Sequence, residues 1–210
     1  LMDDDTIVEK DTLTELLDQA KTLKGKFGWL SSLALWIDGN ECLMNYQEID
    51  KDWNSEKKNI LNGRLRCQAA TFASLFVNRV AVEDVGLPIK DYFIWGDDTE
   101  YTKRISKKYS CYFVPSSQVT HKMKSNMDTT SLEEFTDKER IDRMFYSIRN
   151  DLCTYHRINK RHYYVMILDL LLLIGKVLRS SKPYKIRKVK VIIKGLWKGI
   201  WFSPQIEFAE

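Results

Sequence analysis

Three consecutive aspartates, Asp3, Asp4 and Asp5, follow a short apolar lead near the start of the sequence. A second acidic pair, Asp97 and Asp98, follows an aromatic segment. Carboxylates crowded at the end of a strand repel one another unless a cation or another positive group lies between them. The triplet therefore indicates a site for a hard divalent metal ion with oxygen ligands, and such an ion commonly brings a phosphate with it.

Charge is distributed unevenly along the 210 residues. The net charge is +4, but residues 151–210 contain 12 Lys and Arg against four Asp and Glu, which is +8 and leaves −4 for residues 1–150. We expect the acidic part to carry the chemistry and the basic part to meet an anionic surface. The four cysteines form no CxxC pair, which favours reduced, buried thiols over a zinc site or a disulfide framework.

Local patterns alternate between helix and strand. The capping-box pattern Thr12-x-x-Glu15 predicts a helix that extends to about Leu23. The other predicted elements are a strand at 27–37 with a turn at 38–39, a polar loop at 48–63, a buried strand at 65–77, helices at 79–84 and 98–108, short strands at 112–114 and 118–120, a polar loop at 122–136, and a long helix at 138–156. This order predicts an α/β domain over residues 1–137, followed by a mostly helical, basic region over 138–210.

Several motifs in this order resemble glycosyltransferase family 2, in particular its galactofuranosyl- and rhamnosyltransferase-like branch. The resemblance extends over almost the whole chain. The acidic triplet alone is weakly specific for this family, but the motifs taken together in this order are strongly specific. The motifs are the acidic triplet, the segment Val85-Gly86-Leu87-Pro88, the segment Ile94-Trp95-Gly96-Asp97-Asp98-Thr99-Glu100-Tyr101, His121, and Tyr146-x-x-Arg149-Asn150. The resemblance implies a GT-A fold, with a Rossmann-like mixed sheet.

The resemblance also implies a metal centre. Asp3, Asp5 and His121 would bind Mn²⁺ or Mg²⁺ between the two phosphates of a nucleotide-sugar donor. Oxygen ligands suit either ion, and an imidazole shifts the preference towards Mn²⁺. Asp4 would point to the opposite side of the strand end, towards the donor ribose or sugar.

Asp98 resembles the general base of the family. It would remove the proton of an acceptor hydroxyl as that oxygen attacks the anomeric carbon, with inversion of configuration. Asp97 would orient the acceptor, and Trp95 and Trp29 would stack on sugar rings. For Trp29 a position in the core is the alternative, and it is the more common one for a tryptophan placed in this way. The donor would be of the UDP-galactofuranose or dTDP-rhamnose type, and the acceptor a glycan of a cell wall, capsule or surface polysaccharide, carried on a lipid.

One departure from the family concerns the nucleotide-binding half, which precedes the acidic triplet in the resembling enzymes. We therefore expect this chain to be part of a longer protein, and the 210 residues alone to be inactive. Two other functions stay open at this point: a non-catalytic, membrane-associated scaffold with a degenerate transferase domain, and a metal-dependent phosphohydrolase. A metal-dependent phosphohydrolase would ordinarily show additional clusters of His and Asp metal ligands. This sequence has only one well-placed histidine.

The apolar run from Tyr163 to Ile174 is interrupted by Asp169 and is shorter than the roughly 20 residues that a spanning helix needs. Basic residues continue after it, with Trp197 and Trp201 further on. This pattern predicts an interfacial helix and a peripheral location on the inner face of the cell membrane. Packing on the catalytic domain is the alternative, and a nucleic-acid-binding arm is disfavoured because no recognised binding module accompanies it.

Overall fold

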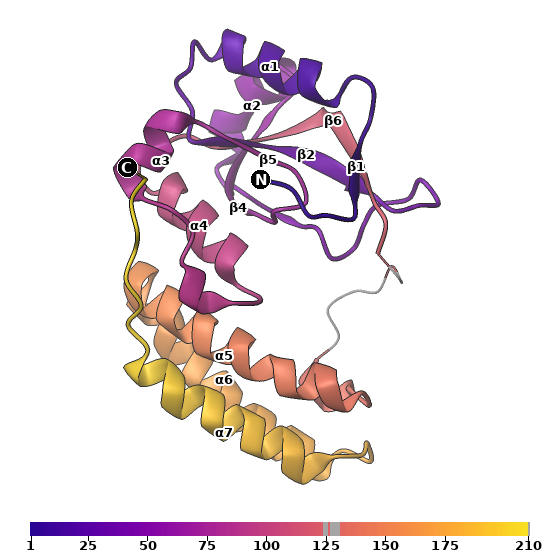
Figure 1. Ribbon diagram of the computed structural model, residues 1–210, viewed down its shortest axis with the longest axis vertical. Helices are drawn as coiled ribbons and strands as arrows, with labels where there is room; N and C mark the ends of the chain where they lie inside the picture. Colours follow the sequence, from indigo (N-terminus) through magenta and orange to yellow (C-terminus); the bar gives the residue numbers. More distant parts are fainter. Residues whose placement is uncertain (124–125, 127–130, 210) are drawn as a thin grey trace. The chain divides into compact units, whose positions relative to one another are not determined.

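The computed structural model describes residues 1–123, 126 and 131–209. In chain order the elements are β1 (Thr6–Val8), α1 (Thr12–Thr22), β2 (Trp29–Leu35), β3 (Gln47–Ile49), α2 (Trp53–Leu61), β4 (Leu65–Ala70), β5 (Leu75–Val77), α3 (Arg79–Val85), the 3₁₀ turn η1 (Lys90–Tyr92), α4 (Asp97–Ser106), β6 (Tyr112–His121), the 3₁₀ turn η2 (Leu132–Glu134), α5 (Lys138–Ile158), α6 (Lys160–Arg179) and α7 (Lys185–Trp201) (Figure 1). The fold is mixed α/β, with a six-stranded mixed sheet and several C-terminal helices.

The chain divides into two compact units. Unit 1 comprises residues 1–87, 101–128 and 207–210, and unit 2 comprises residues 88–100 and 129–206. The predicted boundary at 137/138 lies near the crossing from unit 1 to unit 2 at 128/129, but the sequence gives no sign that residues 88–100 belong to unit 2. The division falls within α4, so its acidic first turn belongs to unit 2 and its second half to unit 1.

Unit 1 is built around the sheet β3-β4-β6-β2-β5, in which only β2 and β6 are parallel. Strand β1 pairs antiparallel with the end of β6, and Thr6 lies opposite His121. Successive residues of β2 point to opposite faces. Leu30 packs with Leu16 of α1 on one face, whereas Trp29 packs with Ile105 of α4 on the other.

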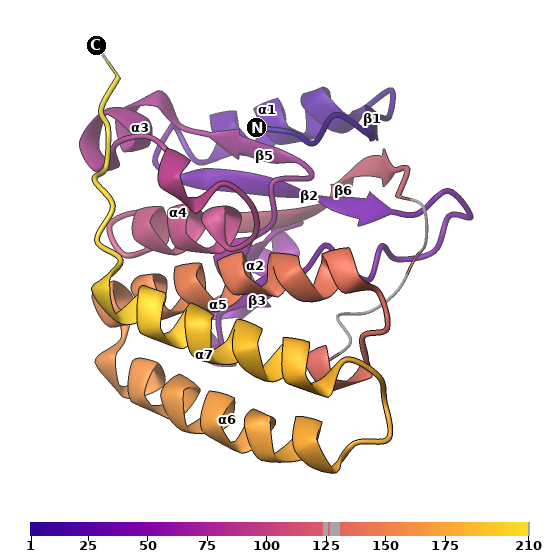
Figure 2. The ribbon, with the colours of Figure 1, turned by 60° about the horizontal axis from the view of Figure 1, so that its bottom comes forward.

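Unit 2 contains the helices α5, α6 and α7, which lie side by side (Figure 2). Its core includes Ile148, Leu152 and Ile192. Two glycines of α7 allow the close approach of α5: a Cβ atom at Gly195 would lie 2.8 Å from Ile148 Cγ2, and one at Gly199 would lie 2.8 Å from Leu152 Cδ1. None of the described helices is both long enough and apolar enough to cross a membrane.

Three predictions about elements are wrong. The predicted polar loop at 48–63 contains the helix α2 and the end of β3. The predicted strand at 65–77 is two strands, β4 and β5, which have different partners. The two short strands around Pro115 are one strand, β6, whose register against β2 shifts so that Pro115 lies in a bulge. The predicted loop at 122–136 lies partly outside the described residues.

Candidate metal centre and acidic helix N-terminus

Sheet pairing brings the acidic triplet to His121. Because β1 runs antiparallel to β6 from Thr6 opposite His121, the residues just before β1 lie beside the end of β6. The backbone N–H of Lys122 donates to the carbonyl oxygen of Asp5, which continues this pairing. On the other side of the triplet, the N–H of Leu75 donates to the carbonyl oxygen of Leu1. The triplet is thus held at both ends by backbone hydrogen bonds.

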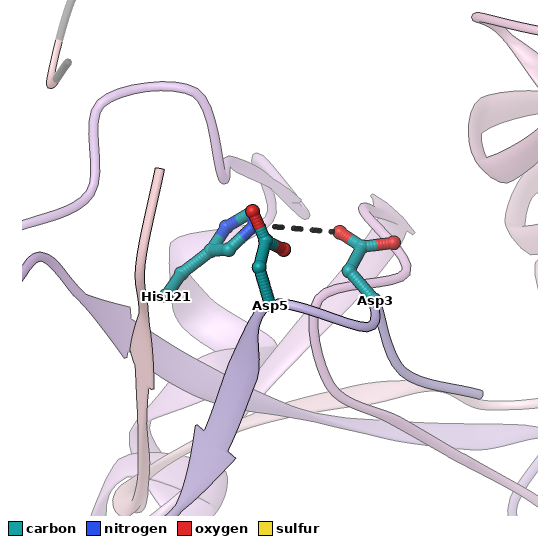
Figure 3. A group of neighbouring side chains, drawn as sticks. All are labelled: Asp3, Asp5 and His121. Carbon is teal, nitrogen blue, oxygen red and sulfur yellow. Dashed lines mark hydrogen bonds and ion pairs between the residues drawn. The ribbon is translucent and has the colours of Figure 1, made fainter. Parts of the chain in front are cut away.

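Asp3, Asp5 and His121 each direct one ligand atom to a common point, and these atoms lie within 4.8 Å of one another (Figure 3). Nε2 of His121 is 2.8 Å from Asp5 Oδ1 and 3.8 Å from Asp3 Oδ2. Adjacent ligands of an octahedral ion with bonds of about 2.1 Å lie about 3 Å apart. The separation of His121 Nε2 and Asp5 Oδ1 fits two adjacent ligands of such an ion, whereas Asp3 Oδ2 lies further from His121. The two carboxylates are exposed, which leaves the other side of the cluster open.

His121 is held in place through the ring nitrogen that faces away from the two aspartates. Nδ1 of the buried imidazole lies 2.7 Å from Oδ1 of Asn45, whose Nδ2 donates to Thr71 Oγ1. The amide oxygen of Asn45 can only accept, so Nδ1 of His121 donates to it, and Nε2 is the ring nitrogen that faces Asp5. A ligand histidine held through its other nitrogen is typical of metal sites.

Asn45 is a residue that the sequence analysis missed. It lies in the segment between β2 and β3, where its own N–H donates to the carbonyl oxygen of Cys42. The thiol of Cys42 lies 3.9 Å from Nδ1 of His121, and burial raises the pKa of this thiol. No spacing rule connects Asn45 to a histidine 76 residues later, so only the folded structure reveals the pair.

Asp97 and Asp98 occupy the first turn of α4, in unit 2. Oδ1 of Asp98 accepts a hydrogen bond from the backbone N–H of Thr99 at 2.6 Å. A helix N-terminus ordinarily stabilises a carboxylate. Here burial, followed by the charges of Asp97 and Asp151, outweighs that effect and raises the pKa of Asp98 to about 6. Burial also raises the pKa of Asp97.

The loop before α4 is held in an unusual conformation. Phe93, Trp95 and Gly96 have φ values of 65°, 61° and 84°, a region that side-chain-bearing residues rarely occupy. A Cβ atom at position 96 would also lie 3.1 Å from Asp151 Oδ1. Strain of this kind collects at functional sites when the surroundings hold it in place.

Asn150 holds this loop. Its side chain is fully buried, and Nδ2 donates to the carbonyl oxygens of Tyr92, Ile94 and Trp95 at 3.0, 3.2 and 2.8 Å. Its Oδ1 accepts hydrogen bonds from Arg149. The sequence motif Arg149-Asn150 marked these residues without giving them a role, and the structure gives them this one.

We predict that Asn150→Ala destabilises unit 2 by about 2–4 kcal/mol, because three carbonyl oxygens and the Arg149 guanidinium lose a buried partner. Chemical denaturation measures this change. Asn159→Ala serves as the control, since Asn159 caps α6 at an exposed position and its loss should cost about 1 kcal/mol. Equal losses in the two variants would contradict the role of Asn150.

The three remaining predicted site residues, Trp29, Asp4 and Trp95, have different outcomes. Trp29 is wrongly predicted to stack on a sugar: its side chain is fully buried, and its indole N–H donates to the carbonyl oxygen of Thr102. Its position in an apolar strand next to Gly28 is equally typical of a core residue, and the core reading is the correct one. Asp4 is exposed, outside the cluster of three ligands. Trp95 is half-buried beside Asp97 in the sequence.

Comparison with known proteins does not place the chain in a family. No family model and no curated protein matches the sequence. The functional assignment therefore depends on the site residues and their geometry.

Proposed function

We propose that the protein is a metal-dependent, inverting glycosyltransferase with a GT-A type fold. It would transfer a sugar from a nucleoside-diphosphate donor, of the UDP-galactofuranose or dTDP-rhamnose type, to a glycan acceptor. The observation that carries the proposal is the convergence of Asp3, Asp5 and His121 at the end of two paired strands. A mixed sheet with helices on both faces supports the choice of fold class.

In this proposal Asp3, Asp5 and His121 hold a Mn²⁺ or Mg²⁺ ion, and Asn45 keeps the imidazole in the tautomer whose Nε2 faces the ion. When bound, the ion supplies charge neutralisation for the departing nucleoside diphosphate. Two carboxylates and one imidazole suit Mn²⁺ somewhat better than Mg²⁺. The open side of the cluster is where donor phosphate oxygens would bind.

Asp98 acts as the general base. Its carboxylate accepts the proton of the acceptor hydroxyl while the hydroxyl oxygen bonds to the anomeric carbon and the bond from that carbon to the diphosphate breaks. A pKa of about 6 leaves most of the carboxylate ionised at neutral pH and makes it a stronger base than an ordinary aspartate. Asp97 would orient the acceptor, and Trp95 would stack on its sugar ring.

The acceptor is proposed to be a cell-wall, capsular or surface glycan on a lipid carrier, and the enzyme to be peripheral on the inner face of the cell membrane. The supporting feature is the composition of unit 2. Helices α6 and α7 together contain ten Lys and Arg residues and one acidic residue, Asp169. Such helices are attracted to anionic lipid surfaces, where lipid-linked acceptors are found.

A panel of nucleotide sugars tests the proposed function. The longest natural form of the protein is incubated with each donor, Mn²⁺ and a glycan acceptor, and the released nucleotide is identified. We expect release of a nucleoside diphosphate that depends on both the acceptor and the metal, and that stops in excess chelator. Release of inorganic phosphate or a nucleoside monophosphate would instead indicate a phosphohydrolase, and full transfer in excess chelator would contradict metal dependence.

A further inference from the structure

Helix α7 has one buried and one exposed side. Its buried residues, which include Val191, Ile192 and Gly195, pack in unit 2. The opposite side exposes large apolar side chains at helical spacing, with Trp197 63% and Trp201 72% exposed. The apolar row consists of Ile186, Ile193, Trp197, Ile200 and Trp201. Exposed large apolar side chains that form one continuous row are typical of interaction sites.

A row of lysines, Lys190, Lys194 and Lys198, lies beside the apolar row at intervals of four residues, so the three side chains share a helix face. All three are exposed, and α7 contains no Asp or Glu. Within the described part of the chain, neither Lys190 nor Lys198 forms an ion pair. The edge of the apolar row is therefore strongly cationic.

A shallow hollow between α5 and α7 adds to this charge. It is lined by Asp142, Ile186, Arg187, Lys190, Val191 and Lys194. The single acid of the hollow is neutralised, because Arg187 donates two hydrogen bonds to Asp142, which lowers the pKa of that carboxyl. Lys190 and Lys194 therefore give the hollow a net positive charge, and Ile186 gives it an apolar wall. This combination fits a phosphate group attached to an apolar body.

We propose that the exposed face of α7, consisting of the apolar row, the lysine row and the hollow, is a docking surface for an anionic phospholipid bilayer. The apolar row enters the interfacial region, where tryptophan is favoured, and the lysines contact headgroup phosphates. Charge complementarity selects this occupant, because a protein partner or a second copy of the chain would have to present a long acidic strip.

The inference rests on the proposed peripheral location but not on sugar transfer, so the test uses no nucleotide sugar. The 210-residue chain is sedimented with vesicles of phosphatidylglycerol and phosphatidylcholine, and with vesicles of phosphatidylcholine alone. We expect binding to the anionic vesicles that weakens as salt is added. The combined variant Lys190→Gln, Lys194→Gln and Lys198→Gln should weaken binding by on the order of 100-fold at low salt, from about fivefold for each lysine.

Two controls make the result specific to α7. Replacing three exposed lysines of unit 1, Lys26, Lys51 and Lys58, by Gln removes the same charge and should change binding by less than about threefold. Trp197→Ser combined with Trp201→Ser should weaken binding even with all lysines present. Because every substituted side chain is exposed, circular dichroism should show an unchanged fold.

Three results would overturn the proposal. One is the absence of binding to anionic vesicles at low salt. Another is equal weakening by the unit 1 and α7 lysine variants, which would indicate a general charge effect. The third is a concentration-dependent dimer that Trp197→Ser abolishes while vesicles are not bound, which would assign the face to a second copy of the chain.

Discussion

Asp98→Asn should lower the turnover number of sugar transfer by about 10²–10⁴-fold, the usual loss when a general base is removed. Asparagine has the shape of aspartate and its Oδ1 can still accept the hydrogen bond from the Thr99 N–H, so the loop and the helix should keep their structure. The affinity for the donor and the metal should stay within about threefold. Steady-state kinetics in the longest natural form of the protein separates the turnover number from binding.

The same substitution should stabilise the fold, by an amount that depends on pH. The pKa of Asp98 is about 6 in the folded protein and near 3.8 when unfolded, so the folded state holds the proton more tightly. The protonated carboxyl therefore favours folding below pH 4, and this contribution is lost as pH rises through 6. Above pH 6 the buried charge costs about 1–3 kcal/mol, which Asp98→Asn removes.

Denaturation of the 210-residue chain over a range of pH checks this second effect. We expect Asp98→Asn to be more stable than the parent at pH 7.5 and equal to it near pH 4. Asp97→Asn is the matched control and should have a smaller effect on turnover. If Asp97→Asn abolishes transfer while Asp98→Asn stays active, the two roles are reversed.

Elements with a strong local signal are predictable from this sequence. The helix expected from Thr12 is confirmed as α1, although the hydroxyl of Thr12 donates to the carbonyl oxygen of Gln118 rather than closing a capping box. The short helix expected at 79–84 is confirmed as α3, and the side chain of Asn78 caps it. Asn78 therefore caps its own helix, whereas Thr12 at the start of α1 hydrogen-bonds to the neighbouring strand β6.

Elements that depend on tertiary contacts are not predictable in the same way. The polar segment before Asn62 forms α2, and its Glu56 is almost fully buried because the carboxylate accepts the backbone N–H of Arg66 in β4. From the sequence alone, a glutamate in such a polar segment is predicted to lie in an exposed loop. Similarly, the break between β4 and β5 appears only because the two strands pair with β6 and β2, respectively.

The candidate site shows the same division. The residue types of Asp3, Asp5 and His121 predicted a metal centre, and the register of β1 against β6 brings the three together. Asn45 and Asp151 were not predicted, because their parts in the site come from long-range packing. Trp29 was misassigned because an aromatic residue at a strand start suits a sugar platform and a core equally well.

The second large effect concerns the ligands of the proposed metal centre. His121→Ala and Asp5→Ala should each weaken Mn²⁺ binding by about 100-fold or more, since each removes one of three protein ligands. Asn45→Ala should weaken it by about 10–100-fold, the usual loss when the partner that orients a ligand histidine is removed. Asp4→Asn removes the same charge from the neighbouring exposed residue, and should change affinity by less than about threefold.

Calorimetric titration of the 210-residue chain with Mn²⁺ tests the central claim most directly, because it needs neither donor nor acceptor. We expect one binding site in the parent chain, its loss in His121→Ala and Asp5→Ala, and its retention in Asp4→Asn. Absence of Mn²⁺ and Mg²⁺ binding in the parent chain, or equal binding by the parent and His121→Ala, would contradict a metal centre formed by Asp3, Asp5 and His121.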